Sequence, residues 1–423
     1  MISNPGLGVV FHWLGGLAAA SFYVPYRNVK RWSWETYWLV GGFFSWIIVP
    51  WIIGLAMTND LAAVLRETPA MSLFWPFFYG VLWGFGGLTF GLTMRYLGMS
   101  LGMAVALGYC AAFGTLMPPI FSGEFVGKVL GTQSGIVILF GVAACLVGIA
   151  FAGVAGISKE REMSEEQKLE VIKEFRLKKG LLVATFCGVM SACFSYGLAA
   201  GDPIRAATLR HGTPVLWQGL PVLVVVLLGG FTTNFVWCVI LNFRNRTGDE
   251  YLNSYSRNHG SAAPAPMRLN YLFCALAGSI WYFQFFFYTM GETQMGAYKF
   301  SSWTLHMASI IIFSSLWGIG LHEWRGTGRR TKALLALSLA LLVGSTMIVG
   351  YGNYLGSKAT QAEACTAQTK VCATGLLTNS WHRLQPMPEV CAFEAQTKVG
   401  ATLAVTWHRL QPVLSGQRTR VAH

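Results

Sequence analysis

The sequence has 423 residues, enough for two or three soluble domains, but its composition excludes such an arrangement. Hydrophobic residues make up 54% of the chain and charged residues only 12%, about half of the ~25% that soluble domains carry. Most of the surface must therefore face an apolar medium, which predicts an all-α polytopic membrane protein in a lipid bilayer. The net charge of +13 does not indicate a nucleic-acid partner, because the Lys and Arg residues lie in short segments between apolar runs.

Ten apolar runs are long enough to cross the hydrocarbon core, which requires about 20 mostly apolar residues. The first five residues lack the basic segment of a cleavable signal peptide, so the first run is predicted to remain as a span. The predicted spans are 5–25, 36–56, 72–93, 97–121, 134–156, 180–200, 215–242, 269–290, 302–322 and 333–353.

The basic residues between the spans are distributed unevenly. Loops after odd-numbered spans hold 19 Lys and Arg residues, and loops after even-numbered spans hold five. Since basic loops stay in the cytoplasm, both termini of the bundle are predicted to lie on the outer side. Arg95 is the lone basic residue in the tight hairpin between spans 3 and 4. It is either a snorkelling charge that fixes topology or a contact for substrate or gating.

A charged linker divides the spans into two groups of five. Residues 158–179 alternate Glu and Lys at helical spacing, which indicates a solvated cytoplasmic helix. The halves 1–157 and 180–355 must enter the membrane in opposite orientations, because five is an odd number. This parity predicts two inverted five-helix repeats with a site near the midplane between them.

The tail, residues 356–423, differs in character from the rest of the chain. It contains an imperfect direct repeat, AQTKVCATGLLTNSWHRLQP at 367–386 and AQTKVGATLAVTWHRLQP at 395–412. The repeat is too polar to span a membrane, and its Cys and His spacing fits no zinc template. We predict a disordered tail, with no metal site and no cofactor.

Ionisable residues inside the predicted spans are few, and such residues are usually functional. His12 lies in span 1 and His306 in span 9, while Glu35 lies at the mouth of span 2 and Glu292 just beyond span 8. Because histidine titrates near neutral pH, each buried one could carry a proton during a transport cycle. The alternative is a neutral imidazole hydrogen-bonded inside the bundle.

Span 8 carries a stripe of aromatic and polar residues. Trp281, Gln284 and Tyr288 share one helical face, and Trp303 and His306 are similarly spaced in span 9. Aromatic rings can cover the C–H faces of a sugar while an amide and a hydroxyl bond its OH groups. Aromatic packing between helices, with Gln284 bonded across, explains the pattern equally well.

These features favour a transporter of a small neutral solute. An enzyme would need paired carboxylates, a histidine cluster or a nucleophile beside a base, and the sequence contains no such constellation. A purely structural or receptor role does not explain polar groups at mid-depth on several helices. Uptake of a sugar and export or exchange of another small metabolite both remain open.

Four stretches carry a family resemblance: NVKRWSWETYWLVGGFFSWIIVPW (28–51), GLTMRYLGMSLGMAVALG (91–108), EFRLKKGLLVATFCGVMSA (174–192) and the block 281–330. Together they resemble the L-rhamnose–proton symporter family of the drug/metabolite transporter superfamily, from about residue 5 to 353. The resemblance implies a ten-helix inverted-repeat bundle in the inner membrane that takes up a sugar together with a proton. Export or exchange of another metabolite by the same fold is the alternative.

The resemblance also adds residues to the candidate site. The proton-coupling candidates are His306, His12 and Glu35. The substrate-binding candidates are Gln284, Tyr288, Trp281, Trp303, Trp34, Arg95 and Tyr96. One departure concerns Lys299, because the family has an acidic residue shortly before its SW-x-LHM motif. If that region contacts sugar or proton, the substrate and the coupling differ from those of L-rhamnose symport.

Overall fold

The computed structural model describes residues 3–97, 99–162, 176–254, 264–322 and 324–378. Within these ranges ten helical segments are long and apolar enough to cross a membrane, and they match the ten predicted spans. The prediction of an all-α polytopic fold is therefore confirmed. The elements are α1 (Pro5–Ser21), α2 (Tyr23–Tyr26), α3 (Trp34–Gly42), η1 (Phe43–Ile48), α4 (Val49–Met57), α5 (Leu61–Glu67), α6 (Ala70–Leu97), α7 (Met99–Phe121), η2 (Phe125–Leu130), α8 (Gln133–Glu162), α10 (Leu177–Ala200), α11 (Asp202–Arg210), η3 (Val215–Trp217), α12 (Leu220–Asn245), η4 (Gly248–Tyr251), α13 (Met267–Gln294), η5 (Gly296–Ser301), α14 (Ser302–Gly320) and α15 (Arg329–Thr378).

The chain forms two compact units, Met1–Gly356 and Ser357–His423. Residues 356–378, the first part of the tail that we predicted to be disordered, continue helix α15, and the rest of the tail lies outside the described residues. Of the predicted linker helix 158–179, the first five residues extend α8 and the last three begin α10. Residues 163–175 lie outside the described ranges.

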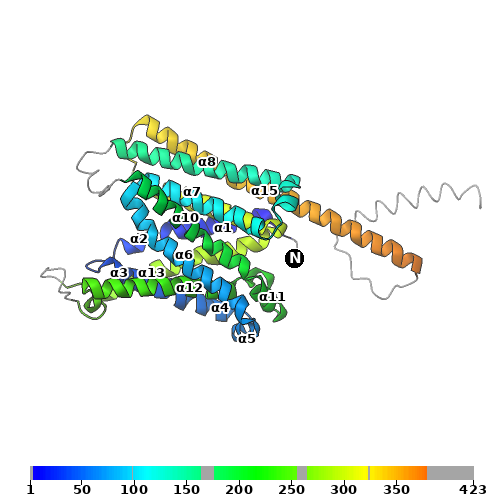
Figure 1. Ribbon diagram of the computed structural model, residues 1–423, viewed down its shortest axis with the longest axis horizontal. Helices are drawn as coiled ribbons and strands as arrows, with labels where there is room; N and C mark the ends of the chain where they lie inside the picture. The colour runs from blue at the N-terminus through cyan, green and yellow to red at the C-terminus, as the bar shows by residue number, and fades with distance from the viewer. Residues whose placement is uncertain (1–2, 98, 163–175, 255–263, 323, 379–423) are drawn as a thin grey trace, which may run out of the picture. The chain divides into compact units, whose positions relative to one another are not determined.

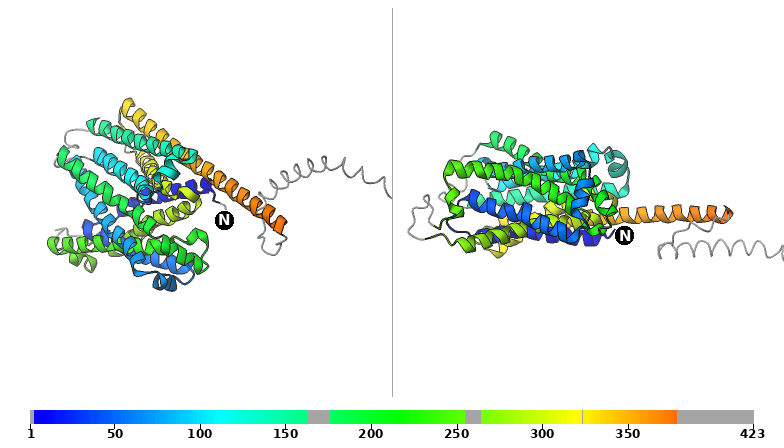
Figure 2. Two further views of the ribbon diagram at one scale, coloured as in Figure 1. Left: turned by 45° about the vertical axis from the view of Figure 1, so that its right-hand side comes forward. Right: turned by 90° about the horizontal axis from the view of Figure 1, so that it is seen from below.

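In the first unit the spans lie side by side with their helix axes roughly aligned (Figures 1 and 2). Arg27 directly follows α2, and Arg95 and Arg244 lie in the last turns of α6 and α12. We call the end of the bundle that holds these arginines the basic end. Helices α5 and α11 lie at the opposite end, at the right of the bundle in Figure 1.

Small residues bring the spans into close contact. A Cβ atom on Gly80 of α6 would overlap the carbonyl oxygen of Val226 in α12. A Cβ atom on Gly15 of α1 would lie 2.8 Å from the carbonyl oxygen of Gln284 in α13. Without side chains at these positions the backbones can approach each other, which is how helices gain packing energy in lipid. The contact at Gly15 sets α1 directly against the part of α13 that carries the polar stripe.

Span 2 contains a π-helical turn, η1, between α3 and α4. Pro50 has no N–H to donate to the carbonyl of Trp46, and the N–H of Val49 reaches back five residues to Phe44. The turn buries the Trp46 side chain, whose ring centroid lies 5.4 Å from that of Trp281. An irregularity in one span therefore helps to build an aromatic wall against another.

Candidate functional site

A cavity of about 150 Å³ lies among five spans at mid-depth. Its volume accommodates on the order of ten water molecules. Most of its wall is aromatic or aliphatic, with a few polar side chains, which is the usual make-up of a small-molecule site. The lining residues come from α6, α7, α10, α13 and α14; they are Trp83, Phe90, Ala106, Leu107, Cys110, Ser191, Trp281, Gln284, Phe285, Trp303, His306 and Met307.

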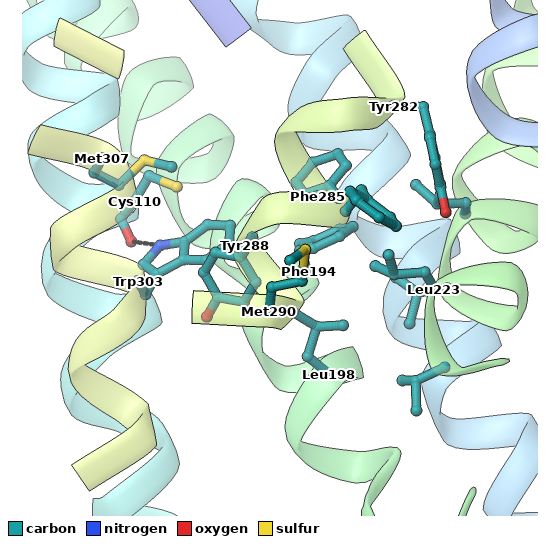
Figure 3. Close-up of a cluster of buried hydrophobic side chains, with 14 of the residues drawn as sticks. Cys110, Phe194, Leu198, Leu223, Tyr282, Phe285, Tyr288, Met290, Trp303 and Met307 are labelled. Atoms are coloured by element: carbon teal, nitrogen blue, oxygen red, sulfur yellow. Dashed lines mark hydrogen bonds between the residues drawn. The ribbon is translucent and has the colours of Figure 1, made fainter. Parts of the chain in front are cut away.

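Four of the sequence-predicted residues line this cavity: Trp281, Gln284, Trp303 and His306. Tyr288 lies one turn of α13 beyond Gln284, and its ring centroid is 5.8 Å from that of Trp303 (Figure 3). The 3.6-residue spacing in span 8 thus places the amide and the tryptophan on the cavity wall, with the phenol one layer further along.

The rings of both histidines pack against Tyr288. The ring centroid of His306 is 5.3 Å from that of Tyr288, and the centroid of His12 is 5.2 Å away. Both imidazoles are fully buried. Among the described residues neither has a hydrogen-bond partner for its ring nitrogens, and the same holds for Nε2 of Gln284. Since a buried polar group is normally bonded, all three side chains are suited to bond a solute, and the imidazoles can also accept a proton.

The aromatic wall includes residues that the sequence did not single out. Trp83 of α6 stacks on Trp281 at 5.6 Å, and Phe194 of α10 stacks on Phe285 at 4.0 Å. No local motif surrounds Trp83 or Phe194, because the spans are apolar on nearly every face. Their only signal is an aromatic ring within a span.

Trp303 is fixed by a hydrogen bond. Its indole Nε1–H donates to the carbonyl oxygen of Cys110 at 3.0 Å (Figure 3). A Cβ atom at Gly114 would overlap the indole, so glycine is what lets α14 approach α7 at this point. Trp303 therefore offers the cavity its ring rather than its N–H.

Glu35 lies away from the cavity, in a group of polar residues at the basic end. Its carboxylate accepts hydrogen bonds from Nδ2 of Asn245 at 2.9 Å and from Oγ1 of Thr247 at 3.0 Å. Two residues earlier, the backbone N–H and the hydroxyl of Ser33 both donate to Glu250 at 2.7 Å. We call these five residues the basic-end clamp. The clamp ties the start of α3 to the end of α12 and to η4.

Tyr251 adjoins the clamp outside the membrane-spanning segments. Burial raises the pKa of its phenol to about 12, and Asn242 donates a hydrogen bond to the phenol oxygen at 2.9 Å. The phenol therefore stays protonated at neutral pH.

The remaining candidates also lie at the basic end. Trp34 is 40% exposed and stacks on Trp38 at 5.4 Å. Arg95 is exposed, and Tyr96 is buried beneath the ammonium group of Lys179, which lies 4.5 Å from its ring centroid. The structure does not bring Trp34, Arg95 or Tyr96 together with the cavity residues.

Lys299, the departure from the family pattern, lies at the opposite end. Its ammonium group donates to both carboxylate oxygens of Asp202, at 2.7 and 2.8 Å. Asp202 in turn accepts a hydrogen bond from Arg205 at 2.7 Å. The positive charge of Lys299 is thus balanced on α11 and does not face the cavity.

Comparison with known proteins gives a consistent result. The sequence model of the L-rhamnose-proton symport protein family matches residues 1–354. Proteins of Cronobacter sakazakii and Klebsiella pneumoniae, both named L-rhamnose-proton symporter, are 39% identical to this chain over 347 residues. The aligned region covers 82% of this chain and 97% of each relative. The family match thus includes all the cavity residues and ends just before the tail.

Proposed function

Because the chain belongs to the L-rhamnose–proton symport family, we propose that it takes up L-rhamnose, or a closely similar neutral sugar, together with a proton across the inner membrane. The observation that carries the proposal is the family match over the whole ten-span bundle. The cavity supports it, since aromatic walls with a few polar groups suit a neutral sugar. Export or exchange of another metabolite is not favoured by the names of the relatives.

The sugar would lie between the tryptophan rings and the polar groups of α13 and α14. Trp281, backed by Trp83, offers a flat apolar surface for the C–H face of the ring. Gln284 and His306 offer buried nitrogen atoms without protein partners among the described residues, and these would bond the sugar hydroxyls. A 6-deoxy sugar such as L-rhamnose also has a methyl group, for which Phe285 and Met307 provide apolar contacts.

The coupled proton would be carried near Tyr288. His306 lines the cavity and the ring of His12 packs against Tyr288, so protonation of either would change the charge near the sugar. Glu35 accepts two hydrogen bonds within the basic-end clamp. We therefore assign Glu35 to holding α3 in place rather than to carrying the proton.

Alternating access would expose the cavity to each side in turn, with the two five-span halves acting as inverted repeats. The excess of basic residues assigns the basic end to the cytoplasm. Phe90 of α6 and Ala106 of α7 extend the cavity toward this end, where a Cβ atom at Gly87 or Gly91 would contact nothing within 4 Å. On the side of the cavity that faces the opposite end, the rings of Tyr288 and Trp303 pack together. These features fit a state closed on the outer side.

The experiment is uptake of radiolabelled L-rhamnose by vesicles that contain the full-length protein, with and without an imposed pH gradient. We expect accumulation above equilibrium only when the outside is more acidic. Uptake that ignores the gradient would refute proton coupling. Failure of unlabelled L-rhamnose to compete with the labelled sugar would refute the substrate.

A further inference from the structure

A buried ion pair lies at the opposite end, beyond Tyr288 and Trp303. Nη2 of Arg205 in α11 donates to Oε2 of Glu292 in α13 at 2.6 Å, and the two side chains are only 9% and 10% exposed. Arg205 also donates through Nη1 to Asp202 at 2.7 Å and to the carbonyl oxygen of Leu198 at 2.8 Å. The pair therefore ties the connection between α10 and α12 to the helix that carries the cavity glutamine.

The place of Glu292 on α13 links this pair to the cavity. Gln284, Tyr288 and Glu292 are spaced four residues apart, so they lie along one face of the helix. Gln284 lines the cavity, and Tyr288 packs against Trp303 at its outer side. Glu292 is the next position along this face. Along this face of α13, Tyr288 and then the ion pair lie between the cavity and the opposite end.

The two carboxylates of the network differ in their surroundings. Asp202 is 54% exposed and is bonded by both Arg205 and Lys299. Glu292 is almost buried and has Arg205 as its one cationic partner among the described residues. The other titratable groups facing it are Tyr288, on the same helix, and His12 of α1, whose ring packs against the adjacent Gly291. If Glu292 became neutral, Arg205 would keep Asp202, so releasing the pair would not leave a buried cation without a partner.

We propose that the Arg205–Glu292 pair is the latch of the outer gate and that Glu292 binds the coupled proton whenever the latch is open. The proposal rests on the uptake function proposed above. In the closed state the guanidinium of Arg205 is hydrogen-bonded to the Glu292 carboxylate as a buried ion pair. When α11 moves away from α13, Glu292 loses that partner and takes a proton from the outer water. Closing the latch returns Arg205 to Glu292, and the proton leaves toward the histidines and the cavity.

This arrangement ties proton release to closure of the outer side. The protonated carboxyl cannot form the ion pair, so a proton that stays on Glu292 disfavours the closed state by simple linkage. Closure therefore requires the proton to leave Glu292, and its transfer toward the cavity rather than back to the outer water couples closure to inward movement of the proton. Lys299 contributes by balancing Asp202, which leaves Glu292 as the carboxylate that depends on Arg205.

The test compares Glu292→Gln with the wild-type protein in two assays on vesicles. The first measures accumulation of labelled L-rhamnose under a pH gradient, and the second measures exchange of labelled for unlabelled sugar without a gradient. We expect E292Q to lose accumulation above equilibrium while exchange continues and no longer varies with pH. The matched control is Glu124→Gln, which removes the exposed Lys128–Glu124 pair and should leave both assays unchanged.

A second variant keeps the test decisive if E292Q does not reach the membrane. Arg205→Gln removes the other half of the latch and should also abolish accumulation while exchange continues, and the double variant should be no worse than either single one. Accumulation by E292Q at the wild-type level would overturn the proposal. Loss of exchange as well as accumulation in both single variants, with the protein present in the vesicles at the wild-type amount, would also overturn it. Failure of the wild-type protein to respond to the gradient would instead refute the proposed function.

Discussion

The basic-end clamp and the cavity both contain buried polar side chains, but the two groups differ in how those side chains are bonded. In the clamp, Glu35 and Glu250 each accept two hydrogen bonds from side-chain or backbone donors. At the cavity, Gln284 and His306 have nitrogen atoms without partners among the described residues. A satisfied buried group stabilises one arrangement, whereas an unsatisfied one costs about 1–3 kcal/mol until a partner arrives. The difference separates a cluster that holds the fold from a site prepared for a ligand.

The largest effect is expected from the cavity histidine. The His306→Ala variant should reduce gradient-driven uptake of labelled L-rhamnose by about tenfold to a hundredfold, the equivalent of one hydrogen bond to a charged group. The reason is that the His306 imidazole lines the cavity proposed to hold the sugar and can carry a proton there. The measurement is initial uptake by vesicles, normalised to the amount of protein inserted.

The control for this variant is His211→Ala. His211 lies near the surface, where its ring is 3.0 Å from the exposed carboxylate of Glu67. This change should leave uptake unchanged. Normal accumulation by His306→Ala would show that this residue is not part of the transport site. An unpartnered buried nitrogen at the cavity would then not indicate a ligand-binding role.

A smaller effect is expected from the aromatic wall. Trp281→Ala removes the ring that stacks on Trp83, and it should raise the KM for L-rhamnose by about tenfold, the upper range for an aromatic contact. Trp281→Phe keeps a ring and should raise KM less. Trp75, which is 43% exposed on α6, provides the control, and Trp75→Ala should leave KM unchanged. An equal change in the Trp75 and Trp281 variants would show that the ring acts through general packing.

The sequence predicts how residues within one span are arranged better than which residues of different spans meet. The ten spans follow from the length of the apolar runs, because lipid rewards any uninterrupted apolar helix. The placement of Trp281 and Gln284 on one wall follows from the helical repeat within a single span. By contrast, Trp83 and Ser191 reach the cavity from α6 and α10, and nothing in an almost uniformly apolar span marks which face is inward.

The motif WSWET shows the opposite limit. It is conspicuous in the sequence, and the resemblance made Trp34 a substrate-binding candidate and Glu35 a proton-coupling candidate. The sequence did not predict the hydrogen-bond partners of Glu35, Asn245 and Thr247, which follow more than 200 residues later in the chain. No spacing rule connects positions so far apart. The sequence did not predict the buried Arg205–Glu292 ion pair for the same reason, because the two residues lie 87 positions apart.

The smallest effect on transport is expected from the clamp, because its residues lie away from the cavity. Glu35→Ala leaves the donors of Asn245 and Thr247 without their carboxylate, so unfolding should become easier by about 1–3 kcal/mol. Thermal unfolding of the purified protein in detergent measures this change, with the exposed Glu67→Ala as the control.

Transport by the clamp variant separates a structural role from a functional one. Among molecules that remain folded, Glu35→Ala should keep the wild-type KM and the wild-type response to a pH gradient, because the cavity residues keep their positions. Burial raises the pKa of the neighbouring Tyr251 to about 12. Its phenol therefore stays neutral near physiological pH and adds no pH dependence to transport. A Glu35 variant that unfolds at the wild-type temperature but no longer couples sugar to protons would place the proton at the basic end. In that case Glu35, a carboxylate that accepts two hydrogen bonds, would be the coupling group in place of the cavity imidazoles.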